Sequence, residues 1–142
     1  MHPTGTVRVP YGRADFLLSF RSPLMSNNLA RHRFAAFNRQ SGRCFYCNLP
    51  MWHGSPAAFT AKYNISEKLA GIFQCTAEHL LARQDGGGNS QSNIVAACLF
   101  CNQRRHQGRK ITDPTQYQRI VQSRVKQKRW HNSWVFERVT PN

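Results

Sequence analysis

The chain has 142 residues, of which 40% are hydrophobic, so we expect one compact domain with short arms and a modest core. Its 20 Lys and Arg residues outnumber 6 Asp and Glu residues, and the formal charge of +14 indicates a polyanionic partner, nucleic acid first. No apolar run is long enough for a membrane span, and residues 16–18 are too short for the core of a signal peptide. We therefore expect an intracellular, cytoplasmic protein that does not bind membranes.

Positive charge is concentrated at the two ends of the chain. Residues 1–43 carry a net charge of +6, residues 44–101 a net charge of 0, and residues 102–142 a net charge of +8. This distribution suits a chemical centre between two arms that bind phosphates. A solvated basic surface without function would give the same pattern.

The N-terminal part is predicted to form an arm followed by a helix. Residues 1–25 contain three prolines and two glycines, which predicts an arm or an edge element. A helix is then predicted to begin with Ser26 or Asn28 as its cap and to end at Ser41-Gly42. Its apolar face would contain Leu29, Phe34 and Phe37.

A loop, a short helix and a hairpin are predicted next. Residues 48–65 contain prolines and few periodic apolar positions, so we interpret them as a loop. Residues 66–70 are predicted as a short helix that the following glycine ends. The strand character of residues 72–81 and 93–97, with turn formers over 84–90, predicts a β-hairpin with a long, glycine-rich connection.

Two helices are predicted in the C-terminal part. Residues 99–106 suit a helix that Gly108 closes, and a last helix is predicted to run from Asp113, as N-cap, toward Trp130. The apolar stripe of this last helix consists of Tyr117, Ile120, Val121 and Val125. The predicted organisation is an N-terminal arm (1–25), a central domain (26–110) and a basic helix and tail (111–142).

The chain has five cysteines, and four of them form two Cys-x-x-Cys pairs: Cys44 with Cys47, and Cys98 with Cys101. The odd count favours a metal site over a disulfide framework. Together the pairs offer four soft ligands to a tetrahedral structural Zn²⁺. The alternative is that one or both pairs are unligated or redox-active. Cys75 is predicted to be a buried strand thiol.

Four side chains near the hairpin have the chemistry that phosphodiester hydrolysis requires, namely a base for water and a cation for the leaving oxygen. Glu78 and His79 are adjacent on the predicted strand, so their side chains project in different directions. Asn102 and His106 are four residues apart and share one helix face. Glu78, Asn102 and His106 are therefore predicted to form an open three-ligand metal site.

The string Glu78-His79-Leu80-Leu81-Ala82-Arg83, followed by Gly86-Gly87-Gly88, Asn93-Ile94-Val95 and Cys98-x-x-Cys101-Asn102, resembles the HNH endonucleases over roughly residues 41–110. The resemblance implies an α+β fold, a small ββα-metal module stapled by a four-cysteine zinc site and flanked by basic helices. It implies that His79 is the general base and that Asn93 holds the loop and orients His79. Asn102 and His106 match positions that bind the catalytic Mg²⁺, Mn²⁺ or another transition metal, whereas Glu78 stands where Asp or His is commoner.

The resemblance further implies an endonuclease that acts on DNA, with double-stranded DNA as the expected partner and 5'-phosphate and 3'-hydroxyl ends on the products. One active centre cuts one strand per event, so cleavage of both strands would require a homodimer or two successive cleavage events. Phosphate contacts are expected from five basic residues: Arg83, Arg104, Arg105, Arg109 and Lys110. His106 could instead face a phosphate.

The alternative is a non-catalytic zinc-ribbon module that binds nucleic acid through its basic arms. A pure binding module has no reason to combine Glu78, His79, Asn102 and His106, and this combination favours the nuclease. The three tryptophans are predicted to be packing residues rather than platforms for stacked bases: Trp52, Trp130 and Trp134.

Overall fold

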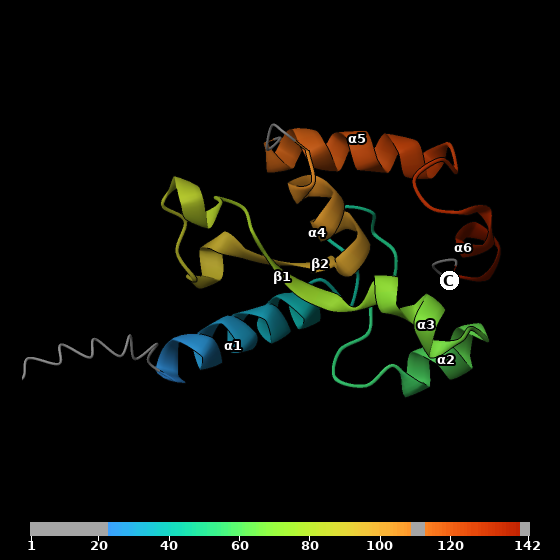
Figure 1. Cartoon of the computed structure of the whole chain (residues 1–142), viewed down its shortest axis with the longest axis horizontal. Helices are drawn as coiled ribbons and strands as arrows, with labels where there is room; N and C mark the ends of the chain where they lie inside the picture. The colour runs from blue at the N-terminus through green and yellow to red at the C-terminus, as the bar shows by residue number, and fades with distance from the viewer. Residues whose placement is uncertain (1–22, 109–112, 140–142) are drawn as a thin grey trace, which may run out of the picture.

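The computed structural model describes residues 23–108 and 113–139 (Figure 1). In chain order the elements are α1 (Pro23–Arg39), α2 (Ala57–Tyr63), α3 (Glu67–Ala70), β1 (Cys75–His79), β2 (Ile94–Cys98), α4 (Leu99–His106), α5 (Pro114–Lys126) and α6 (Ser133–Arg138). Short 3₁₀ helices occur at Gly71–Phe73, Arg83–Asp85 and Gln91–Asn93. Within the described ranges, no helix has both the length and the apolar character that a membrane crossing requires.

The centre of the fold is an antiparallel hairpin of β1 and β2, with Cys75 opposite Cys98 and His79 opposite Ile94. Helix α1 contacts one side of the hairpin, and α4 lies on the other side (Figure 1). Both faces of β2 are covered, which explains why all five of its residues are buried. The predicted strand–loop–strand–helix order, and with it the ββα module, is confirmed.

The free edge of β2 is paired by a side chain in place of a third strand. The amide of Gln40 accepts a hydrogen bond from Ala96 N at 3.0 Å and donates to Ala96 O at 2.8 Å. Ala96 O also accepts from Phe45 N at 2.9 Å. A buried backbone group without a partner would be costly, so these bonds fasten the end of α1 to the hairpin.

The predicted helices agree with the structure where a cap or a glycine marks their ends. The predicted and observed bounds of α4 coincide, and Asp113 Oδ1 caps α5 by accepting from Thr115 N and Gln116 N. Ser66 caps α3 by accepting from Leu69 N. Helix α1 begins at Pro23, before its predicted cap, and ends before residues 41 and 42, whose φ angles are positive. Residues 1–22 of the predicted arm lie outside the described residues.

Three predictions of local structure were wrong. Residues 57–63 form α2 inside the predicted loop, because burial of Phe59 against Phe73 stabilises a helix too short to show periodicity. The first strand is shorter than predicted, since Gly71–Phe73 is a 3₁₀ turn. Helix α5 stops at Lys126 rather than near Trp130, and a further helix, α6, was not predicted.

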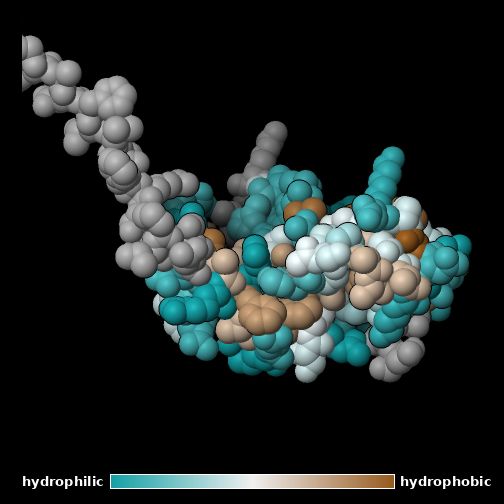
Figure 2. All heavy atoms as spheres, turned by 90° about the horizontal axis from the view of Figure 1, so that it is seen from below, coloured by the Kyte–Doolittle hydropathy of each residue, from teal (hydrophilic) through white to brown (hydrophobic). Residues whose placement is uncertain are grey.

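The core is a single cluster that extends from the hairpin to α5 and α6. Tyr46, Phe73, Val121 and Val135 are fully buried in it. Trp130 is buried, and Trp52 and Trp134 pack against the cluster, so the packing role predicted for the tryptophans is confirmed. Two residues that were placed on apolar faces point outward instead, since Phe34 is 47% exposed and Ile120 is 39% exposed. The face in Figure 2 is mostly hydrophilic, with apolar groups scattered across it.

Candidate functional site

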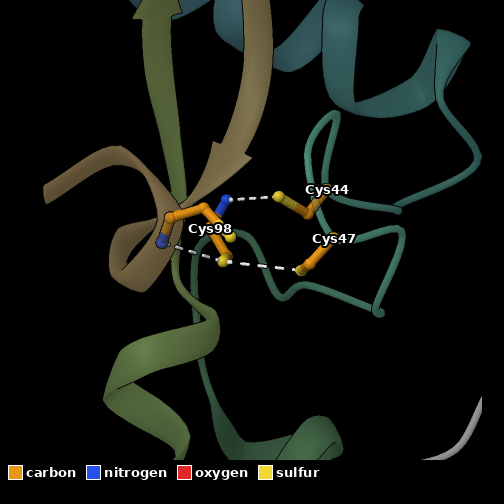
Figure 3. A group of neighbouring side chains, drawn as sticks. Cys44, Cys47 and Cys98 are labelled. Atoms are coloured by element: carbon orange, nitrogen blue, oxygen red, sulfur yellow. Dashed lines mark hydrogen bonds between the residues drawn. The ribbon is translucent and has the colours of Figure 1, made fainter. Parts of the chain in front are cut away.

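The four paired cysteines converge at one point, although fifty residues separate the two pairs. Cys44 and Cys47 lie on a loop that faces Cys98 at the end of β2 (Figure 3). All four Sγ atoms lie within 4.8 Å of one another. A tetrahedral zinc with Zn–S bonds of about 2.3 Å needs sulfurs about 3.8 Å apart. Cys47 Sγ and Cys98 Sγ are separated by 3.9 Å, so the donor set fits a structural zinc ion.

Hydrogen bonds from backbone N–H groups and from one indole orient the sulfurs of the cysteine cluster. Cys44 Sγ accepts from Tyr46 N at 3.4 Å and from Cys98 N at 3.3 Å, and Cys101 Sγ accepts from the Trp130 indole at 3.2 Å. Donors of this kind stabilise thiolates and hold ligands in place. The zinc centre therefore includes a residue from the segment after α5.

Burial and mutual hydrogen bonds shift the pKa values of three of the clustered thiols. Burial alone would raise the pKa of Cys44, but hydrogen bonds from the other three thiols hold it well below its usual value. Hydrogen bonds from neighbouring cysteines raise the pKa of Cys98, and burial raises the pKa of Cys101. Zinc binds thiolates, so loading the site must release protons and favours higher pH.

A polar cleft of about 360 Å³ lies at the other end of the hairpin, and its lining includes Glu78, His79, Asn102 and His106. His79 Nε2 lies 2.8 Å from Asn89 Oδ1 and 3.3 Å from Arg83 Nε. Both contacts engage Nε2, so Nδ1 is the ring nitrogen that neither of them uses. Sequence reasoning missed Asn89, whose only signal was its place in a turn-forming segment.

Glu78 is 1% exposed, and three side chains contact its carboxylate. Oε1 accepts from the Tyr46 hydroxyl at 2.9 Å and forms an ion pair with Arg105. Oε2 lies 3.1 Å from His106 Nε2. Burial and the Glu78 charge raise the pKa of Tyr46, so its phenol stays protonated and donates. The cation beside Oε1 offsets the cost of burying the carboxylate.

Two asparagines form hydrogen bonds that fix the structure near the cleft. Asn102 Nδ2 donates to Thr76 Oγ1 at 2.9 Å and to Ala77 O at 3.3 Å, so its amide is fixed against β1. Asn93 bridges the connection, because its Nδ2 donates to Gly88 O and Leu81 O while its Oδ1 accepts from Leu81 N. A Cβ at position 87 would lie 1.8 Å from Leu81 O, so this close turn requires glycine.

The five basic residues that were predicted to contact phosphates differ in their exposure and contacts. Arg83 is exposed beside His79, and its Nη2 donates to Asn89 Oδ1 at 3.3 Å. The Arg104 guanidinium stacks over Phe100 at 4.6 Å and Trp130 at 5.5 Å. Arg105 is only 4% exposed and is paired with Glu78, so its assignment as a surface phosphate contact is corrected. Arg109 and Lys110 lie outside the described residues.

The remaining cysteine, Cys75, is 3% exposed at the start of β1, as predicted, and it does not belong to the zinc cluster. Burial raises the pKa of its thiol to about 11, which makes it unreactive at neutral pH. In the part of the chain that the structure describes, the zinc cysteines are the only group of three or more Cys, His, Asp or Glu residues arranged to hold a metal. Any ion in the cleft would depend on an amide or water oxygen as well.

The fold and the two sites define a ββα module with a four-cysteine metal centre and a histidine-containing cleft. Residues 66–108 match the family model described as HNH endonuclease. The matched segment contains β1, β2, α4 and the second cysteine pair, whereas the first pair precedes it. No curated protein and no solved structure matches the chain.

Proposed function

We propose that the protein is a metal-dependent endonuclease that hydrolyses phosphodiester bonds in DNA. The observation that supports this best is the cleft, in which Glu78, His79, Asn102 and His106 all contribute to one lining. These side chains supply a base and oxygen and nitrogen ligands, the groups that metal-assisted hydrolysis needs. The match of this segment to HNH endonucleases supports the same reaction.

In this proposal His79 is the general base that takes a proton from the attacking water. Its Nδ1 receives the proton, because Nε2 faces Asn89 Oδ1 at 2.8 Å. The Asn89 contact also opposes rotation of the imidazole and stabilises the ring once it is charged. Asn93 supports His79 indirectly, since it holds the backbone of Leu81, two residues further along the chain.

Glu78 Oε2, Asn102 Oδ1 and His106 would hold one divalent cation, and this donor set suits Mg²⁺, Mn²⁺ or another transition metal. The bound ion would neutralise charge on the leaving oxygen. Asn102 Oδ1 is the ligand atom of its amide because Nδ2 is committed to β1. Glu78 would use a single oxygen, since Arg105 and Tyr46 engage the other.

We further propose duplex DNA as the partner, bound through its phosphates. Arg83 stands at the cleft, and α5 with the turn after it adds five exposed basic residues: Arg119, Arg124, Lys126, Lys128 and Arg129. Within the described ranges the ion pairs all involve Glu78, so these surface cations are not neutralised by neighbouring carboxylates there. One cleft per chain is expected to cut one strand at a time.

A second function has one observation in its favour. The Glu78 carboxylate is buried and already balanced by Arg105, the arrangement expected if Glu78 served only to stabilise the fold. The chain would then be a zinc-ribbon module that binds nucleic acid without cutting it. The position of His79, Asn102 and His106 in the same cleft lining as Glu78 favours the nuclease.

Incubation of supercoiled plasmid with zinc-loaded protein tests the proposal. Mg²⁺ or Mn²⁺ should produce nicked and then linear DNA, and protein freed of loosely bound metal should produce neither. Zinc content is measured in every sample, so that loss of the structural ion is not mistaken for loss of the catalytic one. Binding without cleavage under every divalent metal would support the zinc-ribbon module instead.

A further inference from the structure

Tyr46 connects the two metal-binding regions of the molecule. In sequence it lies between Cys44 and Cys47, inside the loop that carries the first pair of zinc ligands. Its side chain is fully buried, and its hydroxyl donates to Glu78 Oε1 at 2.9 Å, across 32 residues of sequence. The Tyr46 backbone N–H donates to Cys44 Sγ at 3.4 Å. One residue therefore contacts both a zinc ligand and the cleft carboxylate.

The two oxygens of Glu78 have different surroundings. Oε1 faces the interior, where Tyr46 and Arg105 engage it. Oε2 faces His106 Nε2 at 3.1 Å, and both residues line the cleft. A carboxylate held by one oxygen cannot rotate freely, so the interior contacts determine where the second oxygen points.

We propose that Tyr46 is a positioning residue through which the zinc-binding loop sets the orientation of Glu78 in the cleft. Arg105 contributes to the same orientation and supplies the balancing charge. The inference rests on the proposed function, because it takes Glu78 as a ligand of the catalytic ion. It adds a task for the zinc centre beyond folding, namely fixing the loop that carries the phenol.

Packing contacts hold the ring of Tyr46 independently of its hydroxyl. It packs edge-on against Tyr117 with ring centroids 4.8 Å apart and against Phe45 at 5.2 Å. Tyr46→Phe should therefore keep the ring in position while it removes the bond to Oε1. Loss of such an outer contact typically weakens metal binding by about 10- to 100-fold.

Tyr117→Phe is the matched control. Tyr117 is also buried, its ring touches Tyr46, and its hydroxyl donates to Cys101 O at 2.8 Å rather than to Glu78. Both variants remove one buried phenolic hydroxyl next to the zinc centre. Only Tyr46→Phe removes a contact to the cleft carboxylate.

The experiment measures Mn²⁺ binding by electron paramagnetic resonance on zinc-loaded parent, Tyr46→Phe and Tyr117→Phe, with zinc content measured in parallel. Tyr46→Phe should keep one zinc and bind Mn²⁺ about 10- to 100-fold more weakly, and excess Mn²⁺ should restore cleavage. Tyr117→Phe should bind Mn²⁺ as the parent does. If Tyr46→Phe loses zinc, Arg105→Lys is measured instead, because it alters the same Oε1 contact.

The outcomes separate the two proposals. Mn²⁺ binding in Tyr46→Phe that equals the parental value overturns the positioning role and leaves the proposed function intact. Equal weakening in Tyr46→Phe and Tyr117→Phe also overturns it, because the effect would then be one of packing. A parent that binds no Mn²⁺ and does not cut plasmid with any divalent metal overturns the proposed function, and the positioning role with it.

Discussion

The zinc centre and the cleft lie at opposite ends of the same two strands. Cys75 and Cys98 pair at one end of the hairpin, and His79 and Ile94 pair at the other. The zinc ligands are no more than 2% exposed and use only cysteine, whereas the cleft is open and mixes carboxylate, imidazole and amide groups. A closed, saturated centre suits a structural ion, and an open one leaves coordination positions for substrate and water.

The two ends therefore differ in what a substitution should damage. Changes at the zinc end should act on folding, and a change of His79 in the cleft should act on chemistry with the fold preserved. Tyr46 is the exception, since it contacts both ends.

Removal of a zinc ligand should have the largest effect. Cys98→Ser should lose the bound zinc and the cooperative unfolding transition, because metal binding supplies much of the folding free energy in so small a core. Zinc analysis and thermal unfolding measure both effects. Cys75→Ser is the control, since Cys75 is also buried but lies outside the cluster, and it should keep its zinc. A Cys98→Ser protein with parental zinc content would contradict the assignment.

A second effect concerns the loss of folding stability at acidic pH. His131 is 6% exposed among aromatic rings, neither ring nitrogen has a hydrogen-bond partner among the described residues, and burial lowers its pKa to about 4. As the pH falls below 6.5, His131 takes up a proton in the unfolded chain, whereas in the folded chain it does so only near pH 4. The free energy of unfolding therefore falls as the pH falls through this window. The loss should be on the order of 3 kcal/mol.

His131→Phe keeps a ring in the cluster and removes the titrating group. Unfolding measured between pH 7 and pH 4 should therefore show a shallower decline for the variant than for the parent. Protonation of the zinc thiolates affects both proteins, so the difference between them isolates His131. Identical pH dependence in the two proteins would contradict the prediction.

The smallest effect is expected at the surface of the cleft. Arg83→Gln should weaken DNA binding modestly and reduce the slope of log affinity against log salt by about one, the change expected for one lost phosphate contact. Glu137→Gln on α6 serves as an exposed control that removes an opposite charge. A salt slope that Arg83→Gln leaves unchanged would show that Arg83 acts only on His79 and Asn89, which it contacts.

The sequence was most informative where chemistry is local. The two Cys-x-x-Cys pairs predicted the zinc centre because a tight turn already places two thiolates together. The end of α4 followed from Gly108, which cannot sustain a helix as well as other residues do. Helices α2 and α6 could not be predicted in this way, since each is short and is stabilised by tertiary burial of Phe59 or Val135.

The contacts of the cleft depend on how distant segments pack. Nothing in the sequence pairs Tyr46 with Glu78, because their contact exists only after the zinc-binding loop packs on the hairpin. Arg105 could have been interpreted correctly, since it follows the zinc ligand Cys101 by four residues and so shares its buried helix face. Its positive charge instead suggested a phosphate contact.

The most direct test of the account is plasmid cleavage by His79→Ala. The variant should keep parental zinc content, melting temperature and DNA affinity, because His79 lies at the cleft end and contributes no zinc ligand. Its cleavage rate should fall by about 10²- to 10⁴-fold, the range for loss of a positioned general base, and excess Mn²⁺ should not restore it. A His79→Ala protein, free of contaminating nuclease, that cuts at the parental rate would contradict the central claim.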